Sequence, residues 1–191
     1  MTIASPPLAA TESGTDEEHL LTDFTPSSAD LGWYVVNDTV MGGRSEGDFE
    51  KSQSDLYFSG STNTNGGGFS SIRTKPLQLD LSDRVGIRLR VKGDGRRYTW
   101  RLTTDARWRG RQVSYWATFD TEKGAWSTVD IPFTDFEPQF RGYELEGLPL
   151  EPEKITGMGL MIYDNQDGPF ELNLDSVHAY SAKAPLALQE D

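Results

Sequence analysis

Residues 85–103 read VGIRLRVKGDGRRYTWRLT, an alternation of apolar and polar side chains on both sides of a glycine-rich break. Within each half the apolar residues recur at every second position, as do the side chains on one face of a β-strand. The Gly-Asp-Gly break at residues 93–95 has the chemistry of a turn. This stretch therefore predicts two half-buried β-strands that follow one another along the chain.

The same two-residue period recurs through most of the chain. Strands are expected at residues 55–59, 69–73, 76–81, 85–91, 98–102, 115–119, 126–133, 158–162 and 170–174. No segment has a long helical period, and only residues 134–141 have room for one short helical turn. Half-buried strands in series, with turns between them, predict an all-β fold, an antiparallel two-sheet β-sandwich.

The two ends of the chain differ in composition from its middle. Residues 1–19 are small, polar and acidic, and residues 181–191 are similar. Such segments bury too little apolar surface to fold. In a chain of 191 residues we therefore expect a disordered acidic lead-in over 1–19, one sandwich domain over 20–180 and a flexible tail over 181–191.

Composition argues against most catalytic chemistry. The chain has no cysteine, which excludes disulfides, zinc–thiolate sites and thiol nucleophiles. Its two histidines, His19 and His178, are remote from every motif, and no spacing singles out a pair among its 30 acidic residues. Neither a Ser-His-acid triad nor a histidine zinc site is expected. We predict a protein that is not an enzyme and has no catalytic residues. A small enzyme acting on an acidic sugar through Arg101 stays open as an alternative.

Charge is acidic overall but unevenly distributed. The formal net charge is −12, yet ten of the 18 Lys and Arg residues fall between Arg84 and Arg111. An acidic chain is repelled by nucleic acid and by anionic lipid, so nucleic acid is not expected as a partner. The basic cluster leaves two interpretations open: solvated strand faces paired with acids elsewhere, or a cationic patch for an acidic partner.

Nothing in the sequence predicts a membrane span or a targeting segment. No apolar run approaches the roughly 20 residues of a membrane-spanning helix. Residues 1–20 have no cationic start, no long apolar stretch and no arginine, so neither a secretory signal nor a mitochondrial transit peptide is expected. The prediction is a cytoplasmic location.

Several local sequences, taken in order, are more specific than the periodicity. They are WYVVNDTVMGGRS (33–45), NGGGFSS (65–71), GDGRRY (93–98), WSTVDIPF (126–133), Phe136, RG (141–142) and GLMIYDNQDGPF (159–170). Together they resemble the complex I intermediate-associated protein 30 family, over residues 22–180. The stretch NDTVMGGRS is the most diagnostic piece.

This resemblance implies a galactose-binding-like jelly roll without established catalytic residues or cofactor. Eukaryotic members of that family assist the assembly of respiratory complex I. The expected function is therefore a non-catalytic binding module, an assembly factor or scaffold whose partner is a protein in a respiratory or other multi-subunit complex. The alternative is a carbohydrate-binding module with a glycan partner. Some relatives carry a dinucleotide-binding domain, but the glycines here do not follow a strand and open a helix, so no nucleotide activity is inferred.

The first candidate contact site is the loop that contains NDTVMGGRS. Its residues supply turn chemistry, a glycine reversal, a soft apolar group and a guanidinium fork. The candidates are Trp33, Asn37, Asp38, Met41, Gly42, Gly43, Arg44 and Ser45. Two interpretations stay open: Asp38 and Arg44 pair to hold the loop over the sandwich, or the loop contacts a partner.

A second candidate site combines arginine and aromatic residues opposite the core-facing positions. Its members are Arg88, Arg90, Thr99, Arg101 and Trp116, with Arg141 and Tyr163 as further candidates. On neighbouring strands the first five would share one sheet face. Such a face suits sugar stacking or an acidic, aromatic-rich protein surface.

Calcium is the one metal left open. Jelly rolls of this kind sometimes bind a structural calcium ion through oxygen atoms of an early loop and a late strand. Asp23 and Asp175 are the candidate ligands in this sequence. Otherwise no metal is expected.

Overall fold

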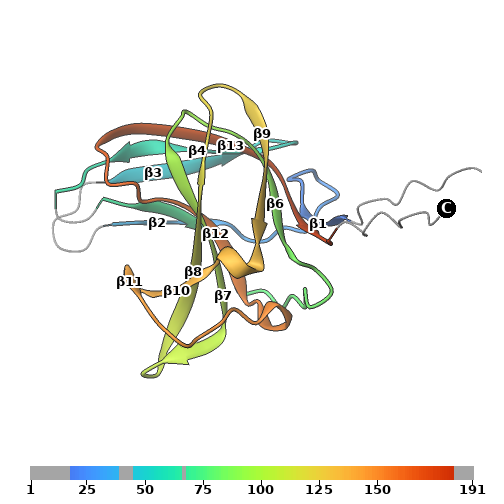
Figure 1. Cartoon of the computed structure of the whole chain (residues 1–191). Coiled ribbons are helices and arrows are strands. Elements are labelled where there is room, and N and C mark those ends of the chain that lie inside the picture. The colour runs from blue at the N-terminus through green and yellow to red at the C-terminus, as the bar shows by residue number, and fades with distance from the viewer. Residues whose placement is uncertain (1–17, 39–44, 66–67, 183–191) are drawn as a thin grey trace, which may run out of the picture.

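A computed structural model describes residues 18–38, 45–65 and 68–182 (Figure 1). Over these residues the chain forms two antiparallel sheets and two short 3-10 turns, and it contains no α-helix. The sheets pack against each other around one hydrophobic core. The predicted antiparallel two-sheet β-sandwich is therefore confirmed.

The six-stranded sheet is organised around its longest strand, β13. Its members are β1 (Glu18–Thr22), β3 (Glu46–Lys51), β4 (Leu56–Thr62), β6 (Gly86–Lys92), β9 (Trp126–Pro132) and β13 (Gly168–Tyr180). The strand order is β3-β4-β13-β6-β9, and β1 also pairs with β13. Residues 168–174 of β13 pair with β4 and residues 173–180 pair with β6, so one strand joins both halves of the sheet.

The seven-stranded sheet contains the long hairpin of β7 and β8. Its members are β2 (Tyr34–Asn37), β5 (Ser70–Arg73), β7 (Arg97–Trp108), β8 (Arg111–Asp120), β10 (Glu137–Phe140), β11 (Tyr143–Glu144) and β12 (Gly157–Ile162). The strand order is β11-β10-β8-β7-β12-β5-β2. β12 is buried along its whole length, because it lies between β7 and β5.

The two strands of residues 85–103 lie in different sheets. β6 belongs to the six-stranded sheet and β7 to the seven-stranded sheet, so the turn at residues 93–95 carries the chain from one sheet to the other. Within this turn Gly95 has a φ of +92°. That value lies in the left-handed range that glycine adopts without steric cost. Both predicted strands are present, but they are not neighbours.

Residues 76–81 do not form the expected strand. Alternate N–H groups, from Leu77 to Leu81, donate to carbonyl oxygens in residues 152–156, and one isolated bridge forms there. That partner segment contains the 3-10 turn η3 (Pro152–Lys154). Because a 3-10 turn cannot extend a ladder, the alternation in residues 76–81 produces no strand.

The helical turn expected at residues 134–141 is present only in part. The 3-10 turn η2 spans Phe133–Asp135, and β10 follows at Glu137–Phe140. Residues 137–139 pair with β8. This pairing holds the second half of the expected turn in an extended conformation.

Five short strands, β1, β2, β3, β10 and β11, are absent from the sequence-based expectation. β1 begins at Glu18, so Glu18 and His19, which composition assigns to the lead-in, pair with β13 instead. Residues 1–17 and 183–191 lie outside the described residues. The division into lead-in, domain and tail therefore stays a prediction.

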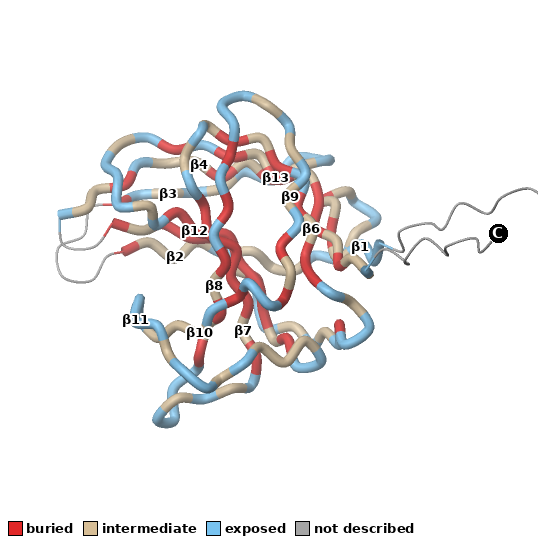
Figure 2. The backbone as a smooth tube through the Cα atoms, in the orientation of Figure 1, coloured by how far each residue is buried: buried red, intermediate tan, exposed pale blue. Residues whose placement is uncertain are grey.

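Large aromatic and aliphatic side chains form the core between the sheets. Tyr98, Trp100, Tyr115 and Phe58 are fully buried, and Figure 2 shows the buried segments of the strands concentrated at the centre of the molecule. Burial of a side chain such as Phe58 contributes about 1.5–3 kcal/mol to stability. The core also fixes which residues of each strand point outward.

A partly buried arginine ties several segments together where β7 begins. Arg96 donates to both carboxylate oxygens of Asp164, at 2.9 and 2.6 Å. Its remaining hydrogen bonds go to the Thr62 hydroxyl and to the carbonyl oxygens of Gln166, Gly168 and Pro169. The Arg96 and Asp164 side chains are only 12% and 3% exposed. This Arg96 clamp holds the loop between β12 and β13 against β4.

Replacement of Arg96 by alanine is expected to lower the free energy of unfolding by about 3–5 kcal/mol, because the Asp164 carboxylate would remain buried without its partner. Urea denaturation followed by tryptophan fluorescence measures this change. Arg97→Gln is the matched control, since the ion pair of Arg97 with Asp120 is exposed and exposed ion pairs contribute little to stability. Equal losses in the two variants would contradict the role of the clamp.

Candidate functional site

The side chains of the seven-stranded sheet that point away from the core form a polar surface, called the outer face below. On β7, Tyr98, Trp100 and Leu102 belong to the hydrophobic core. Thr99 and Arg101 alternate with them and therefore point to the outer face. The same alternation applies to the neighbouring strands.

Strand register places five residues in one row across the outer face. The cross-strand pairs are Trp116–Arg101, Arg101–Gly159, Gly159–Arg73 and Arg73–Tyr34. The row crosses β8, β7, β12, β5 and β2 in that order. Since neighbouring strands lie about 4.8 Å apart, adjacent side chains of this row are within reach of one another.

Gly159 separates the two arginines of this row. A Cβ atom there would lie 2.5 Å from the Ile72 carbonyl oxygen and 3.2 Å from Cγ of Arg101. Any larger residue would therefore displace the backbone of β5 or the arginine stem. Because Gly159 has no side chain, the stem of Arg101 can lie across it.

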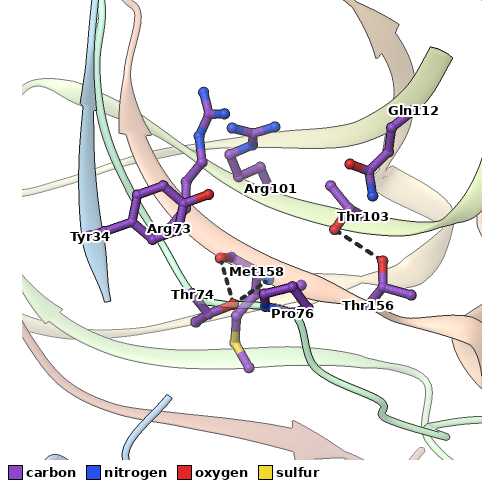
Figure 3. A pocket seen from close by; sticks show the side chains of 10 residues that line it. Tyr34, Arg73, Thr74, Pro76, Arg101, Thr103, Gln112, Thr156 and Met158 are labelled. Atoms are coloured by element: carbon purple, nitrogen blue, oxygen red, sulfur yellow. Dashed lines mark hydrogen bonds between the residues drawn. The ribbon is translucent and has the colours of Figure 1, made fainter. Parts of the chain in front are cut away.

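A cavity of about 180 Å³ opens beside this row (Figure 3). Its lining residues are Tyr34, Arg73, Thr74, Pro76, Arg101, Thr103, Gln112, Thr156, Gly157 and Met158. Figure 3 shows the guanidinium groups of Arg73 and Arg101 next to each other, with Tyr34 beside Arg73. The Thr156 and Thr103 hydroxyls are joined by a hydrogen bond of 3.3 Å. The lining is polar and contains neither a carboxylate nor an imidazole.

Arg101 is an unusual group for a protein interior. Its side chain belongs to a residue only 8% exposed, and its Nη1 is buried without a hydrogen-bond partner. Over the described ranges, no carboxylate forms an ion pair with Arg101 or Arg73. Burial, with repulsion from Arg73, lowers the pKa of Arg101 to about 9. Burial also lowers the pKa of Arg73, whose Nε donates to Ser71 Oγ at 3.2 Å.

The expected single face of arginine and aromatic residues does not form. Arg88 and Arg90 lie on β6 in the six-stranded sheet, whereas Arg101 and Trp116 lie in the other sheet. Arg88 donates to Asp130 and Glu18, and thereby links β6 to β9 and β1. Sequence alternation gives the side of a strand but not its sheet, which is why the five residues are divided between two surfaces.

Arg90 belongs to a separate cationic and aromatic cluster on β6 and β9. Its guanidinium lies 5.4 Å from the centre of the Trp126 ring. Lys92 lies 5.2 Å from the same ring, and Asp175 lies 3.7 Å from Arg90. These contacts explain part of the basic cluster as strand faces paired with neighbouring residues.

Tyr163 extends the outer face beside Trp116. The two rings are in edge contact, with centroids 5.9 Å apart, and Tyr163 also contacts Phe69 at 6.5 Å. Arg141 lies in the turn between β10 and β11, with its guanidinium 5.7 Å from the Phe140 ring. The structure therefore brings Trp116, Tyr163 and Arg101 to one sheet and leaves Arg141 on its β10–β11 side.

The described ends of the NDTVMGGRS loop are structural anchors. Asn37 accepts hydrogen bonds from Gly47 N and Ser70 Oγ at 3.2 and 2.6 Å. Asp38 accepts one from Gly68 N at 3.1 Å, and Ser45 accepts one from Asn63 N at 3.0 Å. These bonds fix where the loop leaves and rejoins the sandwich.

The middle of that loop is not described by the structure. Met41, Gly42, Gly43 and Arg44 lie outside the described residues. Their contact role, and the pairing of Arg44 with Asp38, therefore stay predictions. Trp33, just before β2, packs on Phe24 and Trp100 at 6.2 and 6.4 Å, and so belongs mainly to the core.

Both calcium candidates have other partners. Asp23 accepts hydrogen bonds from the Ser28 hydroxyl and from the hydroxyl and backbone of Thr25, and these bonds lower its pKa. Asp175 lies beside Arg90 and Ser176. Within the part of the chain that the structure describes, no group of three or more His, Asp or Glu side chains converges in a way that could hold a metal ion.

Tyr34, Arg73 and Gly159 were not among the residues predicted for a site. Arg73 ends the strand SSIR, where its outward position follows from the alternation around Ile72. The partnership of Arg73 with Arg101 requires the order β7-β12-β5. No local sequence signal gives that order.

An antiparallel β-sandwich with an open polar face, and a cavity lined without carboxylate or imidazole, is typical of binding modules. The chain belongs to the complex I intermediate-associated protein 30 family, whose model, described as Complex I intermediate-associated protein 30 (CIA30), matches residues 22–174. The resemblance seen in the sequence is thereby confirmed.

Two relatives illustrate this membership. A mouse protein named "Complex I intermediate-associated protein 30, mitochondrial" is 28% identical over 174 residues, which cover 80% of this chain and 53% of the mouse protein. An uncharacterised protein of Schizosaccharomyces pombe is 31% identical over 175 residues, 79% of this chain and 78% of that protein. The chain thus spans about half the length of the mouse relative.

Solved structures confirm the jelly-roll type of sandwich. A family 11 carbohydrate-binding module from Clostridium thermocellum, in complex with a β-1,3-1,4-mixed-linked tetrasaccharide, aligns with a TM-score of 0.62 at 19% identity. The alignment covers 86% of this chain and 96% of the module. At this identity the similarity concerns the fold alone.

The location of the protein stays a prediction. Within residues 18–38, 45–65 and 68–182, no helix has the length and hydropathy needed to cross a membrane. The mouse relative is mitochondrial by name. The cytoplasmic location expected from the sequence is therefore not confirmed.

Replacement of Arg101 by methionine is expected to raise the free energy of unfolding by about 1–3 kcal/mol, because an unpaired buried charge is removed while the stem that lies over Gly159 is kept. The gain should be full below pH 9, where Arg101 is charged in both folded and unfolded chains. It should shrink as the pH rises through about 9, because the folded state then sheds the charge before the unfolded state does.

Urea denaturation of both proteins at pH 7 and pH 10 tests this expectation. Arg97→Gln again serves as the control, because its ion pair is exposed. A loss of stability in the Arg101→Met variant at pH 7 would mean that the guanidinium supports the fold rather than burdening it.

Proposed function

We propose that the domain is a non-catalytic binding module that serves the assembly of a multi-subunit protein complex and contacts its protein partner through the outer face. Family membership supports the assembly role, since the mouse relative is named as a protein associated with a complex I intermediate. Complex I is therefore the first candidate for the partner complex. The polar cavity on the outer face supports binding rather than bond-breaking chemistry.

The residue types of the outer face carry this proposal. Tyr34 is exposed at one end of the arginine-containing row, and Tyr163 is exposed beside Trp116 at the other. Arg73 and Arg101 lie between them. Tyrosine, tryptophan and arginine are the residues that dominate the energetics of protein interfaces. The cavity lining also lacks an ordinary general base.

The outer face by itself is too small for a standard protein–protein interface. Five strands span roughly 20 Å, and strands of about six residues span a similar length. The resulting area, about 400 Å², is half of the ~800 Å² that each partner buries in a standard interface. Edge strand β2 of this sheet ends at Asn37, and the stretch NDTVMGGRS continues from there. On the strength of their residue types we add Met41 and Arg44, which lie outside the described residues, to the proposed contact surface.

Alanine substitution of Trp116 or Tyr163 is expected to reduce recovery of the partner complex about tenfold or more, since interface aromatic anchors contribute at least 1–2 kcal/mol. The measurement is affinity capture from the native cell, with mass spectrometry of the subunits recovered. Trp126→Ala is the matched control, because Trp126 is an exposed tryptophan on the other sheet. Met41→Ala and Arg44→Ala test the loop. Equal recovery with Trp116→Ala and Trp126→Ala would contradict the assigned face.

Glycan binding is the second candidate function. The edge-on pair of Trp116 and Tyr163 offers aromatic surface on which a sugar ring can stack. Affinity electrophoresis through polysaccharide gels distinguishes the two functions. Retardation of the wild-type chain, abolished by Trp116→Ala but not by Trp126→Ala, would favour the glycan.

A further inference from the structure

The charge balance of the cavity is incomplete. Arg101 is nine-tenths buried with one nitrogen unpartnered, and the neighbouring charge is another arginine, Arg73. A buried charge without a counter-charge costs several kcal/mol even after relaxation. Among the described residues, the one further titratable group that acts on both arginines is the phenol of Tyr34, which is not a carboxylate. An anion from outside the described residues would supply the counter-charge that this cavity lacks.

The geometry of the donors indicates the kind of anion. A guanidinium presents a planar fork that matches the two oxygens of a carboxylate. Two such groups lie side by side at the cavity, on β7 and β5, and the residue between them in the row is Gly159 of β12. Two forks that meet one small space can share one carboxylate between them.

The volume limits the size of the occupant. About 180 Å³ corresponds to roughly six water volumes at ~30 Å³ each. It is well below the ~300–1,000 Å³ of sites for drug-sized molecules. The rest of the lining supplies neutral polar groups, Thr103, Thr156 and Gln112. These groups suit hydroxyl or amide groups carried next to the carboxylate.

We propose that the cavity between Arg73 and Arg101 is a carboxylate-binding site. The carboxylate belongs either to a small hydroxylated acid, such as a sugar acid, or to an acidic side chain of a protein partner. Both sources present the same group to the same two arginines. The site does not depend on the proposed assembly function, because the purified chain alone should bind.

Titration of the full chain with D-glucuronate, followed by amide chemical shifts in NMR spectra, tests the free-acid source. Methyl glucoside is the neutral counterpart, and chloride keeps the ionic strength constant. The peptide acetyl-Gly-Glu-Gly-amide tests the side-chain source, with acetyl-Gly-Gln-Gly-amide as its control. We expect saturable shifts around Arg73 and Arg101 with at least one carboxylate probe and none with its neutral counterpart.

Variants then assign the binding to the two arginines. Arg101→Gln is expected to weaken binding of the active probe at least tenfold. Arg101→Lys, which keeps a charge but loses the fork, should be intermediate. Arg97→Gln should bind like the wild type, because Arg97 lies on the same strand but outside the cavity. If Arg101→Gln does not fold, as judged by its own NMR spectrum, Arg73→Gln takes its place, since Arg73 is only half-buried.

Selective binding of glucuronate, or of the glutamate peptide alone, supports the site and identifies the source of the carboxylate. Equal binding of charged and neutral probes, no binding of either carboxylate, or wild-type affinity in both arginine variants overturns the proposal. A chain that binds glucuronate yet recovers no partner complex leaves the site intact and refutes only the assembly function.

Discussion

The ion pair of Arg96 and Asp164 is the constraint on which the arrangement of the sandwich depends. It joins the start of β7, the end of β4 and the loop between β12 and β13, segments far apart in sequence. Because the Asp164 carboxylate is almost fully withdrawn from water and Arg96 is partly so, the pair depends on satisfied hydrogen-bond donors. The guanidinium meets this condition with two carboxylate oxygens, one hydroxyl and three carbonyl oxygens. The position of Tyr163, one residue before Asp164, follows from it.

Arg101 lies a short way further along the chain, on β7, and its electrostatic surroundings are the opposite of those of Arg96. Arg96 is saturated with acceptors, whereas Arg101 is more deeply buried and, among the described residues, lacks an anionic partner. The sandwich tolerates this because its stability comes from the core on the other face of the sheet, where Trp100 and Leu102 are buried. Proteins commonly retain an energetically unfavourable group of this kind at a functional site. This contrast with Arg96 is what marks Arg101 as a candidate binding residue.

Local sequence gave a sound account of the fold and a partial account of the site. The alternation in residues 85–103 predicted β6 and β7, because the side-chain period of a strand is a local property. It could not reveal that the two strands lie in different sheets, since sheet membership depends on long-range pairing. For that reason Arg88 and Arg101 appeared to share a face. Arg73 was missed because its relation to Arg101 exists only through β12.

The family motif and the three-dimensional contacts account for different properties of the same residues. The stretch NDTVMGGRS identified the family, and the structure explains its ends, where Asn37 and Asp38 bond to β3, β5 and the segment before β5. Asp164 accepts a backbone hydrogen bond from Gln166 within its own turn, whereas Asp167 accepts one from Thr64, which is distant in the sequence. What no motif indicated was the deeper role of Asp164 as the counter-charge of Arg96. A residue can satisfy a local rule and a long-range one at once.

The pairing of β1 with β13 has a consequence for how this domain can be built into larger proteins. Glu18 lies directly opposite Tyr180, so the described chain enters and leaves the sandwich at neighbouring points (Figure 1). A domain whose two ends meet can be inserted into a loop of another protein with little disturbance to either. Both ends also belong to the six-stranded sheet. Flanking polypeptide would therefore be attached on the side of the six-stranded sheet. The sheet that carries Arg73 and Arg101 forms the other side of the sandwich.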